Sequence, residues 1–172
     1  MIKVRNNVFE TNSSSMHSFA YRCLNKDNTR YTKEEAIAEL ISNGAVYDSK
    51  SNTIDLTGIG ELDYGWGPET YIDFTNKFIY VLETLYNGSD ESTDSEFSDF
   101  NMFVNCITEF LEIEKFIYPG NGTEWKSGSY SFASIDHQSF GDILRDIRDS
   151  EYNLVDFCLD RKFVLIIDND NH

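Results

Sequence analysis

Apolar residues recur at helical spacing in two long segments of the chain. The first runs from Pro68, which suits the first position of a helix, to the break at Asn87-Gly88. The second begins at Phe100 and continues toward Phe116. Between them, residues 88–99 are acidic and nearly free of apolar side chains, a composition typical of a flexible, solvated loop. We therefore expect two antiparallel helices joined by an acidic loop.

Local end signals predict shorter helices elsewhere. Thr32 and Glu35 have the spacing of a capping box, in which the Thr hydroxyl and the Glu carboxylate each accept a hydrogen bond from the backbone of the other residue. This helix should run to about Ser42, where Asn43-Gly44 supplies a residue suited to the left-handed conformation that ends helices. Residues 142–148 and 151–159 also have helical spacing.

Alternating apolar and polar residues predict strands in the remaining segments. The expected strands are residues 2–10, 17–24, 45–48, 53–58, 129–136 and 163–167, the second pair forming a hairpin. Hairpins mixed with helices favour an α+β fold over a doubly wound parallel sheet. At 172 residues the chain has the size of one domain. We therefore predict a single globular domain over residues 1–172, with a mostly antiparallel sheet packed against several helices.

The composition is acidic but rich in apolar side chains. Hydrophobic residues make up 40% and aromatic residues 15% of the chain, enough to build a core. Thirty acidic residues against 14 Lys and Arg give a formal net charge of -16. This charge repels nucleic-acid phosphates and anionic membranes, so neither is an expected partner. Basic proteins and cations are favoured instead.

The cysteines and the ends of the chain suggest a reducing compartment. Cys23, Cys106 and Cys158 are far apart in the sequence and show neither a disulfide framework nor the spacing of a zinc site. The first residues lack the apolar run of a signal peptide, and no segment has the length needed to cross a bilayer. We therefore expect a cytoplasmic protein. The sequence indicates neither a cofactor nor an oligomeric state.

A polar turn near the N-terminus is the first candidate binding site. Its hydroxyl, amide and imidazole groups could donate hydrogen bonds to a phosphate or carboxylate. The same residue types are also common in ordinary tight turns, and no Lys or Arg lies among them. The candidate residues are Thr11, Asn12, Ser13, Ser14, Ser15 and His17.

Two further polar segments extend this candidate site. Asp136, His137 and Gln138 follow a predicted strand, where binding residues are often placed. Asp168 and Asp170 follow the last predicted strand and offer oxygen ligands, although a solvated tail would have the same composition. A mixed metal site is therefore possible if the fold gathers its members, which are His17, Asp136, His137, Asp168 and Asp170.

A different set of residues is suited to binding a protein partner. Trp66 lies between two glycines before a predicted helix, and exposed tryptophans contribute strongly to interfaces. A tryptophan covering the domain's own core is the alternative. The acidic segment adds carboxylates that would attract a basic surface, namely Asp90, Glu91, Asp94, Glu96 and Asp99.

Four short segments of the sequence resemble one family. They are NVFETNSSSMHS, LDYGWGPE, IDHQS and IIDNDN. With them the chain resembles a family of uncharacterised proteins of Gram-positive bacteria and their phages, which begin with a similar FETNSSSxHS segment. The resemblance implies a phage or mobile-element origin and a shared site among the polar segments. It implies no activity.

Three hypotheses follow for the function. The first is an acidic phage-type protein that binds and inhibits a basic protein of the bacterial host, such as a nucleic-acid-handling or defence enzyme, in the manner of anti-CRISPR or anti-restriction proteins. The second is a metal-assisted hydrolase, or a protein that binds a small ligand or nucleotide through residues 11–17 with Asp136 and His137. The third is an accessory structural protein without an active site.

Overall fold

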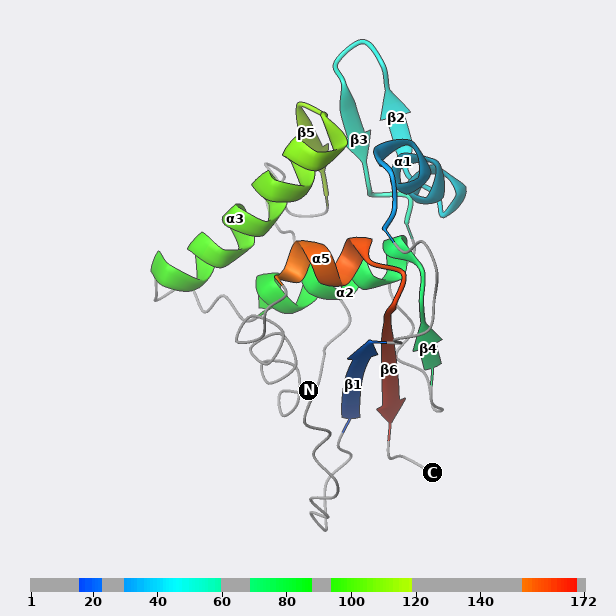
Figure 1. Cartoon of the computed structure of the whole chain (residues 1–172). Coiled ribbons are helices and arrows are strands. Elements are labelled where there is room, and N and C mark those ends of the chain that lie inside the picture. The colour runs from blue at the N-terminus through cyan, green and yellow to red at the C-terminus, as the bar shows by residue number, and fades with distance from the viewer. Residues whose placement is uncertain (1–15, 23–29, 60–68, 88–93, 119–152, 170–172) are drawn as a thin grey trace.

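Two small sheets and the helices between them make up the described part of the protein (Figure 1). The computed structural model describes residues 16–22, 30–59, 69–87, 94–118 and 153–169. In chain order its elements are β1 (Met16–Arg22), α1 (Lys33–Ser42), β2 (Val46–Asp48), β3 (Thr53–Asp55), β4 (Glu69–Tyr71), α2 (Phe74–Asn87), α3 (Asp94–Leu111), β5 (Lys115–Ile117), α5 (Leu154–Leu159) and β6 (Phe163–Asn169). This is the predicted α+β fold in one domain.

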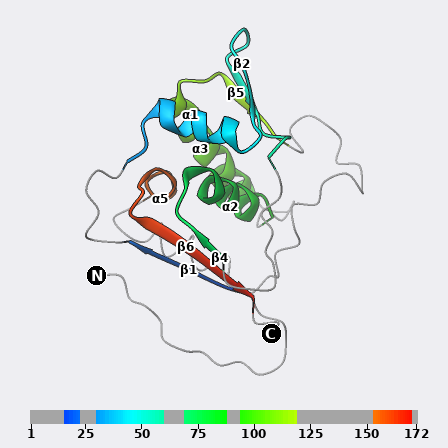
Figure 2. The same ribbon diagram turned by 90° about the vertical axis from the view of Figure 1, so that its right-hand side faces the viewer.

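The elements are arranged in layers (Figure 2). One layer is the antiparallel sheet with strand order β1-β6-β4. Helices α2 and α5 lie against this sheet, and α1, α3 and the second sheet lie on the far side of α2. Strand β6 is the central strand of its sheet, which accounts for its nearly continuous apolar sequence, since Phe163, Val164 and Leu165 are all buried.

The second sheet joins a local hairpin to a distant strand. Strands β2 and β3 pair antiparallel, as the sequence predicts, and β5 pairs parallel to β3. Asn52 in the hairpin turn connects the two parts, because its side-chain amide donates to the Glu112 carbonyl at 2.9 Å. Its own carbonyl accepts from the Glu114 N–H at 2.8 Å. These two bonds fix the end of α3 against the hairpin.

Helix α1 has the predicted ends. The Thr32 hydroxyl accepts from the Glu35 N–H at 3.2 Å, and the Glu35 carboxylate accepts from the Thr32 N–H at 2.9 Å. Both halves of the capping box are therefore formed. Gly44 follows the helix with φ +109°, the left-handed region that the sequence signal requires.

The predicted start of α2 is wrong. Residues 69–71 form β4 and pair with β6, and the helix begins only at Phe74. The Asp73 carboxylate accepts from the Asn76 N–H at 2.8 Å, as an N-cap residue does. Pro68 suits a helix start, but the β-forming Thr70 and Tyr71 can pair with a strand that lies far away in the sequence.

The predicted limits of α3 are also wrong at both ends. The helix starts at Asp94, so the second half of the expected loop 88–99 is helical. The helix dipole favours acidic residues in a first turn, so an acidic segment fits the start of a helix as well as a loop. At the other end, Glu112 takes a positive φ of 52° after Leu111. Phe116 therefore belongs to β5 rather than to the helical stripe.

Several predicted elements lie outside the described residues. These are the strand at 2–10, the turn at 11–15, the first half of the acidic loop, the strand at 129–136 and the helix at 142–148.

The core is built around α2, which is buried on all sides. From Phe74 to Leu85 only Asn76 is not buried. Phe78 is central to an aromatic cluster: its ring centroid lies 5.4 Å from that of Phe74, 6.0 Å from that of Phe103 and 5.3 Å from that of Phe116. This cluster joins α2 to α3 and β5.

A substitution at Gly44 tests why glycine is needed in the turn between α1 and β2. A Cβ at this position would overlap the Gly58 carbonyl oxygen, and the φ of +109° would be strained for any L-residue. We expect Gly44→Ala to lower the free energy of unfolding by about 1–3 kcal/mol in urea titrations. Ser49→Ala in the exposed hairpin turn is the control and should change it by less than about 0.5 kcal/mol. Equal stability of both variants would contradict this account of the turn.

Candidate functional site

Some of the predicted site residues lie within the described part of the chain, and the others lie outside it. Positions 11–15, 66, 90–91, 136–138 and 170 lie outside the described residues; they carry Thr11, Asn12, Ser13, Ser14, Ser15, Trp66, Asp90, Glu91, Asp136, His137, Gln138 and Asp170. Within the description, β1 and β6 carry His17 and Asp168, and α3 carries Asp94, Glu96 and Asp99.

Two of the proposed metal ligands are brought together by the sheet. In the antiparallel β1–β6 ladder, His17 is the direct partner of Asp168. Directly opposed residues in such a ladder have Cβ atoms about 5 Å apart. The sequence places these residues at opposite ends of the chain, so this pairing is a product of the fold. Among the residues that the structure describes, no group of three or more His, Cys, Asp and Glu is placed to hold a metal ion.

The most unusual polar group in the described core is the amine of Lys77. This residue lies in the first turn of α2 and is completely buried. Its Nζ donates to the carbonyl of Asp160 at 2.9 Å and to that of Phe163 at 3.3 Å. Nζ also lies 5.8 Å from the centroid of the Phe157 ring. Lys77 thus connects α2 to both ends of the turn between α5 and β6.

Burial changes the acid–base behaviour of this amine. Loss of hydration lowers the pKa of Lys77 from 10.5 to about 8, while Cys158, Asp160, Asp73 and Glu39 partly oppose the shift. The difference between these two pKa values means that burial disfavours the protonated, charged form of the amine by about 3 kcal/mol. Burial also raises the pKa of the Cys158 thiol, although nearby Lys77 opposes the rise. Cys158 is therefore a protonated, buried thiol rather than a reactive thiolate.

A second polar group, centred on Glu39, connects α1 to α2. Its carboxylate Oε1 accepts from the Thr75 N–H in the first turn of α2 at 2.7 Å. The Tyr31 hydroxyl is also hydrogen-bonded to Glu39, and burial together with this bond raises the pKa of Tyr31 to about 12. The Arg161 guanidinium stacks 4.1 Å from the Tyr31 ring centroid and pairs with Glu35 at 2.9 Å.

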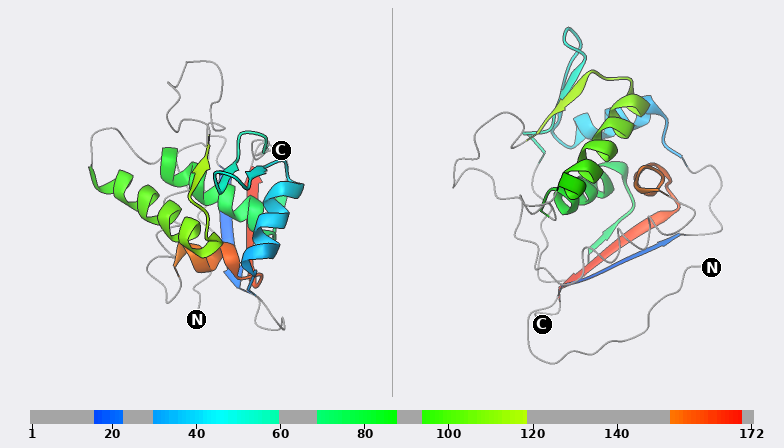
Figure 3. Two further views of the ribbon diagram at one scale, coloured as in Figure 1. Left: turned by 90° about the horizontal axis from the view of Figure 1, so that it is seen from above. Right: turned by 90° about the vertical axis from the view of Figure 1, so that its left-hand side faces the viewer.

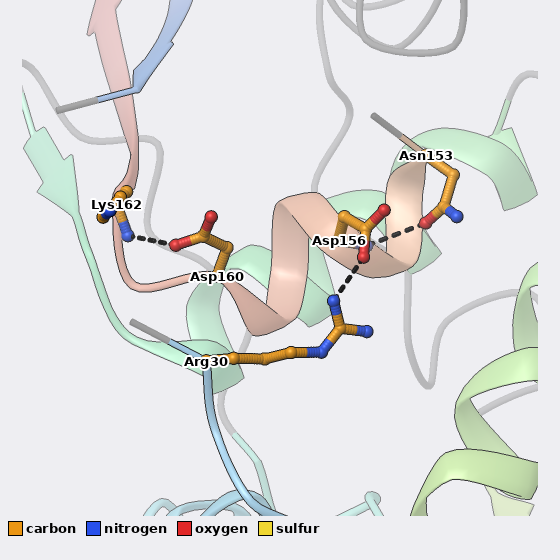
Figure 4. A network of polar contacts seen from close by, with 5 residues as sticks. All are labelled: Arg30, Asn153, Asp156, Asp160 and Lys162. Carbon is orange, nitrogen blue, oxygen red and sulfur yellow. Dashed lines mark hydrogen bonds and ion pairs between the residues drawn. The ribbon is translucent and has the colours of Figure 1, made fainter. Parts of the chain in front are cut away.

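Polar contacts also hold the two ends of α5 (Figure 4). The Asn153 side chain accepts from the Asp156 N–H at 2.8 Å and caps the helix. Arg30 forms an ion pair with Asp156. At the other end, the Asp160 carboxylate accepts from the Lys162 N–H at 2.8 Å. Together with the Lys77 bonds, these contacts determine where β6 begins.

The outer face of α3 forms a different kind of surface. Helix α3 lies on the outside of the molecule and faces the viewer in the right-hand view of Figure 3. Exposed residues recur along this face at one-turn spacing: Asn101, Met102, Asn105, Cys106 and Glu109. Residues 94–114 contain no Lys or Arg but six acids, which are Asp94, Glu96, Asp99, Glu109, Glu112 and Glu114.

Glu112, one of these acids, is paired within the molecule. The Glu112 carboxylate lies 2.5 Å from Lys33 Nζ, and this contact lowers the pKa of Glu112. Glu109 and Glu114 are exposed. We call the acids of residues 94–114, together with the exposed residues of α3 between them, the α3 acidic face.

Lys77 is not among the residues predicted from the sequence, although the sequence carries a signal for it. Lys77 lies three residues after Phe74 and four before Val81, so it is a lysine inside the apolar stripe of α2. A charged residue at such a position must find partners inside the protein. The partners could not be predicted, because they are backbone carbonyls of a distant turn.

Comparisons with protein-family models, curated proteins and solved structures found no match to this chain. Across the described part of the chain, none of the helices combines the length and the apolar character required to traverse a membrane.

Substitutions at Glu39 test the contribution of the hydrogen bonds that connect α1 to α2. We expect Glu39→Ala to lower the free energy of unfolding by about 1–2 kcal/mol, because the Thr75 N–H and the Tyr31 hydroxyl lose their acceptor. Glu39→Gln keeps an oxygen acceptor and should lose less. The matched control, Glu34→Ala, changes an exposed acid of the same helix. Urea titrations measure all three variants, and a loss in Glu34→Ala as large as in Glu39→Ala would refute this role.

Proposed function

We propose that this protein is an acidic binding protein that engages and inhibits a basic protein of a bacterial host cell, and that it acts in the cytoplasm. The observation that carries the proposal is the α3 acidic face: residues 94–114 contain six acids and no Lys or Arg, and Glu109 and Glu114 are exposed. The formal net charge of -16 adds a long-range attraction for cationic surfaces. The resemblance to bacterial and phage proteins supports a host protein as the target.

The geometry of α3 suits a surface that binds a partner. Its inner side is held firmly, because Phe100, Phe103 and Ile107 are buried against the core. Its outer side therefore presents the exposed Glu109 on a rigid element, which limits the conformational entropy lost on binding. Met102 is 57% exposed, lies two helical turns before Glu109 and offers an apolar contact on the same outer side.

The buried amine gives less support for an enzyme. A lysine with a lowered pKa can act as a nucleophile or base when a substrate reaches it. Lys77 is completely buried, and its two hydrogen bonds go to backbone carbonyls. Its contacts are those of a structural residue, so the described residues favour a binding protein over a lysine-dependent enzyme.

The partner of such a surface would be chosen by charge. Opposite charges increase the association rate and select the partner, and added salt weakens them. A basic groove that normally binds nucleic acid presents positively charged side chains. The carboxylates of the α3 acidic face would bind to these side chains in place of the phosphates. Nucleic-acid-handling and defence enzymes of the host are therefore the proposed targets.

A second candidate function rests on the pairing of His17 with Asp168. An imidazole and a carboxylate on neighbouring strands are two ligands that Zn²⁺ accepts. Together with Asp136, His137 and Asp170 they would complete a site for a metal-assisted hydrolase. The serine-rich segment 11–15 precedes β1 directly and would bind the small ligand or nucleotide.

Charge removal on α3 tests the first proposal. Asp94→Asn/Glu96→Gln/Glu109→Gln removes three charges from α3, and Glu34→Gln/Asp48→Asn/Asp55→Asn removes three from α1 and the hairpin. Both variants have the same net charge. Each tagged protein is used to capture proteins from host extract, and the affinity of the purified partner is then measured. We expect the α3 variant to bind a basic partner at least about tenfold more weakly than the control variant.

Two further results are expected if the proposal holds. Raising the salt concentration from about 0.1 M to about 1 M should release the partner, because the Debye length falls from about 10 Å to about 3 Å. The wild-type protein should also inhibit the activity of the captured partner. Equal weakening in both variants would mean that only the net charge matters, and that result contradicts a role for the α3 acidic face.

Zinc titration tests the second candidate. Calorimetry of the whole chain with Zn²⁺ should show about one bound ion, and His17→Ala/His137→Ala should abolish this binding. His172→Ala changes the one other histidine of the chain and is the matched control. No zinc binding by the wild type, or zinc binding that survives in the double variant, would exclude this site.

A further inference from the structure

Lys77 connects the central helix to a tight turn. The turn follows α5 and closes with a hydrogen bond from the Phe163 N–H to the Asp160 carbonyl at 3.1 Å. Lys77 donates to the carbonyls of the same two residues. Phe163 is also the first residue of β6, on which both β1 and β4 pair. A change at the amine therefore acts directly on the start of the central strand.

The amine is enclosed by several elements that carry ionisable groups. Glu39 comes from α1, Asp73 from the residue before α2, Cys158 from α5, and Asp160 from the turn itself. Of the hydrogen bonds described for Lys77 Nζ, both go to carbonyl oxygens, and neither goes to a carboxylate. Among the described residues, burial thus removes the protonated amine from bulk solvent, and the hydrogen bonds it makes there go to neutral carbonyls.

We propose that the protonation state of Lys77 controls the opening of the turn between α5 and β6. An ammonium group is far better hydrated than a neutral amine, so protonation favours any state in which Lys77 reaches water. Reaching water requires the turn to leave α2, because its two carbonyls cover the amine. The neutral amine favours the closed turn. This regulatory role is separate from the α3 acidic face and does not depend on the proposed function.

The direction of the effect follows from the pKa of the amine. In the closed state this pKa is about 8, and in an open, hydrated state it returns toward 10.5. Between these values the open state binds more protons, so a rise in pH favours the closed state by up to about tenfold per unit. Below about pH 8 the amine is protonated in both states, and the opening equilibrium no longer depends on it.

Cys158 supplies a probe of the opening. Its thiol is completely buried in α5, next to the turn, and can react only when the structure opens. The experiment uses the whole chain with Cys23→Ser and Cys106→Ser, which leaves Cys158 as its one thiol. Labelling with a methanethiosulfonate is measured from pH 6.5 to 10. Dividing each rate by that of the urea-unfolded chain at the same pH gives the opening constant.

We expect the opening constant to be flat below about pH 7.5 and to fall by up to about tenfold per unit between about pH 8 and 10. Lys77→Met, an apolar side chain of similar length, should remove this dependence. Lys162→Met changes the lysine inside the turn and should retain it. An opening constant without pH dependence in the wild type, or the same slope in Lys77→Met, would overturn the proposal.

Two further measurements keep the test decisive. If Lys77→Met does not fold, NMR titration of the Lys77 side chain in the wild type replaces it. A midpoint near 8 that coincides with the labelling curve supports the proposal, and a midpoint above 10 overturns it. Small additions of urea separate local opening from unfolding. If they accelerate labelling with the full slope of global unfolding, the reactive state is the unfolded chain, and opening of the turn alone is ruled out.

Discussion

The burial of α2 from Phe74 to Leu85, with Asn76 as the exception, is the constraint on which the rest of the structure depends. This helix contacts α1, α3 and α5, so every polar group on it needs a partner inside the protein. The Thr84 hydroxyl uses the carbonyl of Tyr80, one turn earlier in the same helix. The Thr75 N–H donates to the Glu39 carboxylate of α1, and Lys77 donates to a carbonyl of the turn before β6. The neighbours of α2 are thus positioned by hydrogen bonds as well as by apolar packing.

The sequence predicts the local features of this fold well and the distant pairings poorly. The capping box of α1, its glycine stop and the β2–β3 hairpin are all confirmed, because their causes lie within a few residues. Two of the errors fall at 69–71 and at Phe116, segments that continue an apolar stripe and yet form strands. Each pairs with a strand far away in the chain, and no local pattern reveals such a partner.

The candidate sites show the same division. The pairing of His17 with Asp168 follows from the register of two strands at opposite ends of the chain, which composition cannot give. The acidic character of residues 94–99 is visible in the sequence, but its placement on a helix rather than a loop is not. Lys77 is visible as an interruption of an apolar stripe. Its role depends on two carbonyls, and every residue offers a backbone carbonyl, so the sequence does not show which ones Lys77 uses.

The parallel pairing of β3 with β5 has a consequence for how the chain folds. The hairpin that contains β3 can form from neighbouring residues alone, but Thr53 meets Lys115 only after the intervening chain, with α2 and α3, has folded back. Contacts between distant segments of this kind slow folding. Until β5 arrives, one edge of β3 has unpaired backbone groups, and such edges can pair with other chains. The protein is therefore most exposed to misassembly during synthesis, before the second long helix has been completed.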